Sequence, residues 1–190
     1  YTEETAKECM EKIFLPTVRA MKREGRPFRG CLYFGLMLTP DGPKVIEYNC
    51  RFGDPETQVV LPLLKSDLFT VMKAVTEGKL AETDVEFSSD SACCVVVASS
   101  GYPTSYQTGY PLAVPEDTTR DFTFVAGAKT DGEGRTVSAG GRVVGVTSVR
   151  PTLAEAVSAA YERVKKVGLE NGYYRKDVGK RALEAGKNKG

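Results

Sequence analysis

The segment at residues 44–58 constrains the fold of this chain more than any other. A Pro-Asp-Gly-Pro turn at residues 40–43 precedes it, and the β-branched pair at residues 45–46 follows the turn, so a β-strand is expected there. Side chains alternate along a strand, which places Glu47 and Asn49 on the same face. A carboxylate beside an amide oxygen suits a hard divalent cation such as Mg²⁺, which takes oxygen ligands.

The residues directly after this strand are dense in polar groups. Residues 51–58 hold an arginine, two carboxylates, an amide and a turn glycine within one short loop. A Glu-x-Asn pair often ends a strand by chance, so this continuation is what favours a functional site over a solvated surface loop. We therefore interpret residues 44–58 as half of an active site.

The first part of the chain predicts a helix followed by a hairpin. Apolar residues within 3–24 recur at helical spacing, and Pro16 is expected to kink or interrupt that helix. Residues 30–38 and 44–49 are expected to pair around Gly42, which can adopt a positive φ. The first strand is apolar almost throughout, so we expect both of its faces to be buried.

A second helical pattern follows, and then the sequence changes character. Residues 66–77 predict a helix capped by Ser66 or Asp67 and ended by Gly78. Beyond residue 79, turn residues recur every few positions between short β-branched or aromatic segments. The strands expected from these segments are at 92–99, 122–128 and 142–149.

The last predicted helix completes a two-domain organisation. Residues 152–167 predict a helix with Thr152 as N-cap and Glu155 at the capping-box position. We therefore expect one domain at residues 1–78 and a second, small β-rich domain with a covering helix at residues 79–190.

Composition excludes several classes of function. The chain has 26 basic and 25 acidic residues, so its net charge of +1 provides no field that would attract nucleic acid or a membrane surface. No apolar run reaches the roughly 18 residues that a membrane helix needs. The five cysteines show no Cys-x-x-Cys spacing, which favours a reducing compartment, the cytoplasm. The chain has no histidine, which leaves carboxylates, Arg, Lys and backbone amides for chemistry.

Separate blocks of the sequence resemble one known family. They are 30–38, 41–58 with its Arg-Phe-Gly-Asp-Pro-Glu-Thr-Gln run, 61–68, 101–109, 124–127, 140–143 and 174–182. In this order they resemble glycinamide ribonucleotide synthetase, the phosphoribosylamine–glycine ligase family of the ATP-grasp superfamily. The resemblance implies an enzyme of purine biosynthesis that uses ATP to activate glycine as glycyl phosphate. The amine of 5-phosphoribosylamine then attacks, giving glycinamide ribonucleotide, ADP and phosphate.

The resemblance also implies roles for the residues after the first hairpin. Glu47 and Asn49 would hold Mg²⁺ or Mn²⁺ on the ATP phosphates. Arg51 would act in catalysis and bind the glycine carboxylate or the acyl phosphate, since its planar fork suits both. Asp54 would also act in catalysis, and together with Gly53 it would bind substrate. The Asp54 carboxylate would hold the glycine ammonium or a ribose hydroxyl.

Three basic residues of the second domain are candidates for the ribose 5-phosphate. Lys129 and Arg142 are expected on neighbouring strands near glycine turns, and the resemblance implies that basic residues of this region bind the phosphate, although Lys and Arg on hairpins are usually only solvated. Arg175 would bind the phosphate or, alternatively, pair with an Asp and dock the C-terminal tail. The chain departs from many members at residues 126–128, where Ala128 replaces a threonine.

The fold implied by the resemblance is α+β. It comprises the C-terminal lobe of an ATP-grasp domain, with an antiparallel sheet and helices, followed by a sandwich-like or barrel-like β domain. No glycine-rich ATP loop is recognisable, so we expect a missing N-terminal portion of the same polypeptide as partner and no turnover by this chain alone. The alternatives are another ATP-grasp ligase, or a binding module that has lost catalysis.

Overall fold

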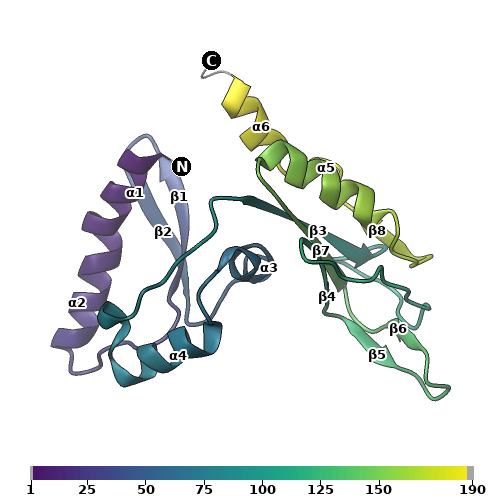
Figure 1. Ribbon diagram of the computed structural model, residues 1–190, viewed down its shortest axis with the longest axis horizontal. Coiled ribbons are helices and arrows are strands. Elements are labelled where there is room, and N and C mark those ends of the chain that lie inside the picture. Colours follow the sequence, from purple (N-terminus) through teal and green to yellow (C-terminus); the bar gives the residue numbers. More distant parts are fainter. Residues whose placement is uncertain (1, 188–190) are drawn as a thin grey trace. The chain divides into compact units, whose positions relative to one another are not determined.

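The structure is a computed structural model, and it describes residues 2–187. The described chain divides into two compact units, the first formed by residues up to 53 and 66–85, the second by residues 54–65 and from 86 onward. Both units combine helices with antiparallel strands, drawn as coils and arrows in Figure 1. The expectation of a mixed fold with antiparallel sheets is therefore confirmed.

The first unit begins with the predicted helix, interrupted where proline requires it. The helical run consists of α1 (Glu3–Cys9), a π-helical segment (Met10–Phe14) and α2 (Leu15–Arg23). Pro16 lies in the first turn of α2, directly after the π-helical segment, and has no N–H to donate within this continuous helical run. The N–H of Leu15 donates to the carbonyl of Met10, five residues back, so the helix widens just before the proline.

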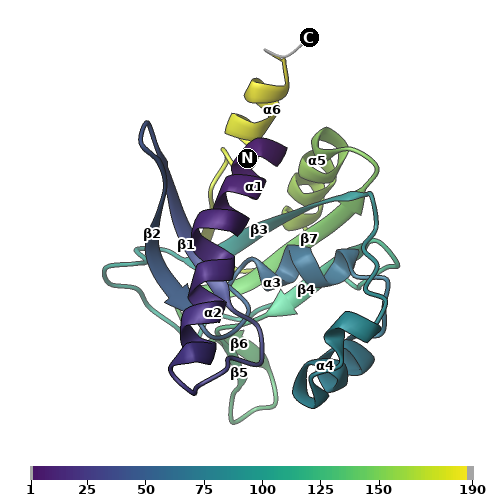
Figure 2. The same cartoon turned by 90° about the vertical axis from the view of Figure 1, so that its left-hand side faces the viewer.

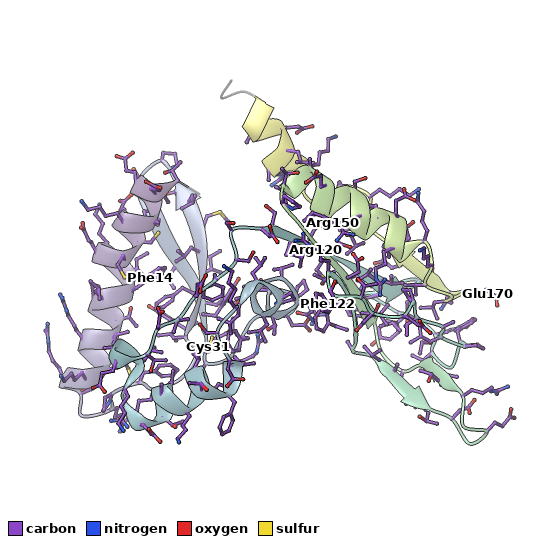
Figure 3. The ribbon with its side chains drawn as sticks, viewed as in Figure 1. Phe14, Cys31, Arg120, Phe122, Arg150 and Glu170 are labelled. Carbon is purple, nitrogen blue, oxygen red and sulfur yellow. The ribbon has the colours of Figure 1, made fainter. Side chains whose placement is uncertain are left out.

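A β-hairpin packs on this helix. Strands β1 (Tyr33–Thr39) and β2 (Gly42–Asn49) pair around Gly42, which has a φ of 90°. Figure 3 shows Phe14 on the side of the helix that faces the hairpin, and its ring centroid lies 4.4 Å from that of Phe34. The predicted hairpin is thus confirmed.

The expected burial of both faces of the first strand is wrong. Met37 and Leu38 of β1 are 53% and 51% exposed, and Ile46 and Tyr48 of β2 are exposed as well. Met37 and Leu38 are adjacent and point to opposite faces, so neither face is fully covered at this end of the hairpin. Within residues 2–187 the sheet has only its two strands, and the helix packs on part of it.

The second helix of this unit has the predicted ends. α4 spans Leu68–Glu77, and the Asp67 carboxylate accepts a hydrogen bond of 2.7 Å from the N–H of Thr70. Gly78 ends the helix in the left-handed conformation. A single 3₁₀ turn, Leu80–Glu82, follows.

The second unit is built on a four-stranded antiparallel sheet. Its strand order is β4 (Asp121–Val125), β7 (Arg142–Arg150), β3 (Ser91–Ser99) and β8 (Gly172–Tyr174). A separate two-stranded sheet pairs β5 (Ala128–Thr130) with β6 (Thr136–Ser138). The strand expected at 122–128 therefore breaks near Gly127, and Lys129 and Arg142 lie in different sheets, not on neighbouring strands as expected.

Helices cover both faces of the four-stranded sheet. α5 (Leu153–Val164) begins with the predicted capping box, and its Ala156, Ala160 and Val164 pack into the core with Val146 of β7. On the other face lies α3 (Thr57–Val60), continued by a 3₁₀ turn (Leu61–Leu63), as Figure 2 shows. α6 (Lys180–Lys187) is the last described element. None of the helices within residues 2–187 has the length and apolar character to cross a membrane.

The adjacent cysteines of β3 face opposite sides of this sheet, as strand geometry requires. Cys93 belongs to the core under α5, whereas Cys94 lies toward the face covered by α3. Burial raises the pKa of the Cys93 thiol to about 11, and burial also raises the pKa of Cys94. Both thiols are therefore protonated and unreactive at neutral pH, which fits packing better than redox chemistry.

Candidate functional site

Glu47 and Asn49 lie together at the end of β2. The amide nitrogen of Asn49 donates to a carboxylate oxygen of Glu47 over 2.9 Å, so the two side chains share a face as predicted. Gly35 is the residue opposite Glu47 on β1. A Cβ atom at Gly35 would lie 2.7 Å from Cγ of Glu47, so the glycine gives the carboxylate its space.

This pair supplies a donor set that fits Mg²⁺ or Mn²⁺. The oxygen and nitrogen of an amide are interchangeable by rotation, so Asn49 can present its oxygen beside the Glu47 carboxylate. Within residues 2–187 there is no group of three or more His, Cys, Asp and Glu side chains arranged to hold a metal ion. Two protein oxygens, with the remaining ligands from phosphate and water, is the usual pattern for Mg²⁺ bound with a nucleotide.

Arg51 lies just beyond the strand and keeps its charge available. The strand ends at Asn49, so Arg51 belongs to the following bend and not to the strand face. Its guanidinium donates a hydrogen bond of 2.8 Å to the carbonyl oxygen of Phe52. Arg51 forms no ion pair within the described residues. An exposed guanidinium without a carboxylate partner suits an anionic ligand.

Asp54 and Arg142 form an ion pair across 88 residues of sequence. One guanidinium nitrogen of Arg142 lies 3.0 Å from Oδ2 of Asp54, and the other donates 2.9 Å to the carbonyl oxygen of Asp54. Both residues belong to the second unit, at the beginning of its first segment and of β7 respectively. The sequence predicted each residue separately as a site residue, but it did not predict that they meet.

Glycines fix the backbone at Arg142. The N–H of Gly127 donates to the carbonyl oxygen of Arg142 over 2.9 Å, and a Cβ at Gly127 would lie 2.5 Å from that oxygen. A Cβ at Gly141 would lie 2.1 Å from the ring of Tyr102. Tyr102 is itself held, since its carbonyl accepts a hydrogen bond of 2.7 Å from the hydroxyl of Tyr173. These contacts require glycine at both positions and hold the backbone from which the Arg142 side chain extends.

The other two basic candidates lie apart from this ion pair. Lys129 is exposed on β5, in the two-stranded sheet. Arg175 donates two hydrogen bonds to Asp177, of 2.9 and 2.7 Å, and these bonds and the charge of Asp177 raise its pKa. The Arg–Asp pair thus exists but is local. Docking of this segment comes instead from the hydroxyl of Tyr161, which donates 2.8 Å to the carbonyl oxygen of Arg175.

Gln58 is the residue that sequence reasoning did not single out. Its side-chain nitrogen donates a hydrogen bond of 2.9 Å to Oδ1 of Asp54. Its backbone carbonyl oxygen accepts a hydrogen bond of 2.9 Å from the hydroxyl of Thr147 on β7. Asp54 precedes α3, and the turn at residues 54–56 brings the two side chains together, with the N–H of Gln58 donating to the carbonyl oxygen of Pro55 over 3.2 Å. The helical spacing rule therefore gave no signal for this contact.

Two family models match the chain in succession. The ATP-grasp (A) domain of phosphoribosylglycinamide synthetase matches residues 1–57, and its C domain matches residues 92–181. Together these matches include Glu47, Arg51 and Arg142.

The similar proteins are named as phosphoribosylamine–glycine ligases or as bifunctional purine biosynthetic proteins. A phosphoribosylamine–glycine ligase of Caldanaerobacter subterraneus subsp. tengcongensis is 44% identical over 176 residues, covering 93% of this chain and 42% of that protein. The corresponding ligase of Halalkalibacterium halodurans is 45% identical, with 96% and 42% covered. A bifunctional purine biosynthetic protein of Pichia angusta is 46% identical, with 99% and 24% covered. The chain thus spans less than half the length of these relatives.

A solved structure agrees with these sequence matches. The crystal structure of a phosphoribosylamine–glycine ligase from Thermotoga maritima superimposes with a TM-score of 0.81 at 34% identity, covering 93% of this chain and 44% of that one. The fold, the order of the sequence blocks and the two family models all point the same way. The chain belongs to the phosphoribosylglycinamide synthetase family, within which it spans part of the ATP-grasp domain and the C domain.

Proposed function

We propose that this chain is part of a phosphoribosylamine–glycine ligase. The enzyme would join glycine to 5-phosphoribosylamine at the expense of ATP, forming glycinamide ribonucleotide, ADP and phosphate in purine biosynthesis. The observation that carries the proposal is the Glu47–Asn49 pair followed at once by the unpaired Arg51, within a chain of this family. The named ligases among the relatives support it.

Glu47 and Asn49 are proposed to hold Mg²⁺ or Mn²⁺. The cation, when bound with ATP, would neutralise charge on the phosphates as the terminal phosphoryl group moves. The protein's own contribution is to present two oxygens on one strand face, with Gly35 leaving the carboxylate its space.

Arg51 and Asp54 are proposed to act on glycine and its activated form. The Arg51 guanidinium would pair with the glycine carboxylate or with the acyl phosphate, which both present two oxygens to its planar fork. Asp54, next to Gly53, would accept hydrogen bonds from the glycine ammonium or from a ribose hydroxyl. The part-exposed carboxylate of Asp54 keeps acceptor capacity for such a donor beside its two protein partners.

The ribose 5-phosphate is proposed to bind basic residues of the second domain, with Arg142, Lys129 and Arg175 as candidates. Arg142 has the best-defined position of the three, but it already pairs with Asp54, so a phosphate would compete with that carboxylate. Arg175 would likewise have to leave Asp177. Lys129 makes no ion pair within the described residues.

The domain assignment follows the same proposal. Residues 1–78 would be the C-terminal part of the ATP-grasp domain, and residues 79–190 the β-rich, sandwich-like or barrel-like domain with α5 as its covering helix. Exposed apolar residues on β1 and β2 support a partner in the remainder of the polypeptide, which would cover that face of the sheet. The chain alone would then be inactive. Five free cysteines support a cytoplasmic location.

The test uses the full-length enzyme that carries this chain. ADP formation should require glycine and 5-phosphoribosylamine together, and Arg51→Ala should abolish most of it while the fold is retained. The matched control is Arg23→Ala, which removes an exposed guanidinium from the end of α2. Activity that depends on a different acid or amine would contradict the proposal, and an Arg51→Ala enzyme with both kcat and KM for glycine unchanged would remove Arg51 from it.

A further inference from the structure

The amide of Gln58 has an orientation that Asp54 dictates. Its nitrogen lies 2.9 Å from Oδ1 of Asp54. An ionised carboxylate only accepts hydrogen bonds, so the group that faces it must be the NH₂ and not the oxygen. The oxygen of Gln58 is therefore turned into the protein, where it is buried and has no hydrogen-bond partner among the described residues.

This arrangement is not explained by the stability of the fold. A buried acceptor without a partner destabilises the folded state, and such groups are few in native structures. A methionine at position 58 has a similar shape and would leave no acceptor unpaired. Glutamine gains only its bond to Asp54, a side chain that is itself 46% exposed. The role of the amide is therefore to hold that carboxylate.

Gln58 is well anchored for such a role. Its backbone carbonyl accepts 2.9 Å from the buried hydroxyl of Thr147 on β7. Its side chain passes over Gly145, where an added Cβ would lie 3.7 Å from Cγ of Gln58 and 3.0 Å from Sγ of Cys94. The four-stranded sheet thus provides a rigid support directly beneath the amide.

The two oxygens of Asp54 each have a separate partner. Gln58 holds Oδ1, and Arg142 lies 3.0 Å from Oδ2. Two partners on two oxygens fix the plane of the carboxylate as well as its position. The Gln58 amide is neutral, so it orients Asp54 without adding a second positive charge that would compete with a cationic or hydroxyl donor on a ligand.

We propose that Gln58 is a positioning residue, which holds the Asp54 carboxylate ready for a hydrogen-bond donor of the substrate. The proposal rests on the proposed function, in which that donor is the ammonium of glycine or a hydroxyl of the ribose. Gln58 itself touches neither substrate. Its effect passes through the direction in which Asp54 points.

The experiment is a double-mutant cycle in the full-length enzyme, with Gln58→Met, Asp54→Asn and the two combined. Gln58→Met should raise KM for one substrate by about tenfold, since small losses of orientation have effects of this order or larger. KM for ATP should not change, and the melting temperature should stay equal or rise. In the Asp54→Asn background, Gln58→Met should cause no further rise in the KM for that substrate.

The substrate whose KM rises identifies the donor that Asp54 accepts from, glycine for the ammonium and 5-phosphoribosylamine for the hydroxyl. The control is Gln107→Met, the same chemical change at an exposed amide that accepts from the hydroxyl of Tyr110. Unchanged kinetics in Gln58→Met, or a loss that adds fully to that of Asp54→Asn, would overturn the proposal. A wild-type enzyme that makes no ADP from glycine and 5-phosphoribosylamine would instead overturn the proposed function.

Discussion

The two groups of candidate residues differ in where their hydrogen-bond and ion-pair partners come from. Glu47, Asn49 and Arg51 come from one short segment, and their hydrogen bonds are to neighbours one or two residues away. Asp54 and Arg142 come from distant segments, and the protein itself pairs them. The first group thus offers its charges outward, whereas the second group is already assembled without a ligand. Substitutions in the first should affect activity alone, and substitutions in the second both activity and stability.

The largest effect is expected at Glu47. Glu47→Gln removes the charge that would hold the cation and should lower kcat for ADP formation by roughly a hundredfold to a thousandfold, the range seen when one electrostatic contact to a transition state is lost. Because the side chain is exposed, unfolding free energy should change by less than about 0.5 kcal/mol. Kinetics and denaturant unfolding of the full-length enzyme check both.

A matched control for this change is Lys44→Gln, which also neutralises an exposed charge on β2. It should leave kcat and stability almost unchanged. A Glu47→Gln enzyme that keeps full activity at saturating Mg²⁺ would remove the metal role from this residue, and one that unfolds would contradict the outward character of the first group.

Arg142 should show both effects at a smaller size. Arg142→Ala leaves the Asp54 carboxylate with Gln58 alone and should lower unfolding free energy by about 1 kcal/mol, a modest value because both side chains are partly exposed. It should also lower kcat/KM about tenfold by freeing Asp54 to turn. Denaturant midpoints and initial rates are the measurements.

The far end of the same strand provides the control. Arg150, the last residue of β7, donates to both oxygens of Asp121 at 3.0 and 3.2 Å, and Arg150→Ala should lower stability with no effect on KM. Equal kinetic losses in the two variants would mean that damage to β7, and not the pairing with Asp54, explains the result.

The cap of α5 should influence stability alone. Thr152→Ala removes the side-chain half of the capping box, in which the Thr152 hydroxyl accepts from the N–H of Glu155, and leaves the backbone N–H of residue 152 to donate to the Glu155 carboxylate. Unfolding free energy should fall by about 1 kcal/mol. Thermal unfolding checks this, and Thr108→Ala provides a comparison with an exposed threonine outside the helices. A change in KM for either substrate would argue against the division between cap and site.

The sequence predicted features that depend on near neighbours. The hairpin at Gly42, the capping of α4 by Asp67 and the shared face of Glu47 and Asn49 all follow from local geometry, and the structure agrees with each. The burial of β1 was predicted wrongly. Its apolar sequence indicates that both faces can be buried, but not whether the described residues include the segments that would cover them.

Features that depend on distant segments were not predicted. Asp54 can pair with Arg142 only because β7 lies beside residues 54–58. Lys129 is separated from Arg142 because the predicted strand ends near Gly127 and the next strand, β5, belongs to another sheet. No pattern within either segment determines such a meeting, because each of these basic side chains is equally compatible with solvent.

The smallest effect is expected from acid, which should weaken the second unit in part through Asp121. Burial works against ionisation there, but hydrogen bonds from Ser148 and Arg150 and the charge of Arg150 hold the pKa of Asp121 below its ordinary value. A lowered pKa in the folded state means a contribution that is present above the unfolded value of about 3.9 and is lost as pH falls through the folded pKa. Between about pH 6 and pH 3, a range that includes the unfolded pKa, the denaturant midpoint should fall more for the wild type than for Asp121→Asn. Parallel curves would show that the Asp121 carboxylate adds nothing to the acid sensitivity of the second unit.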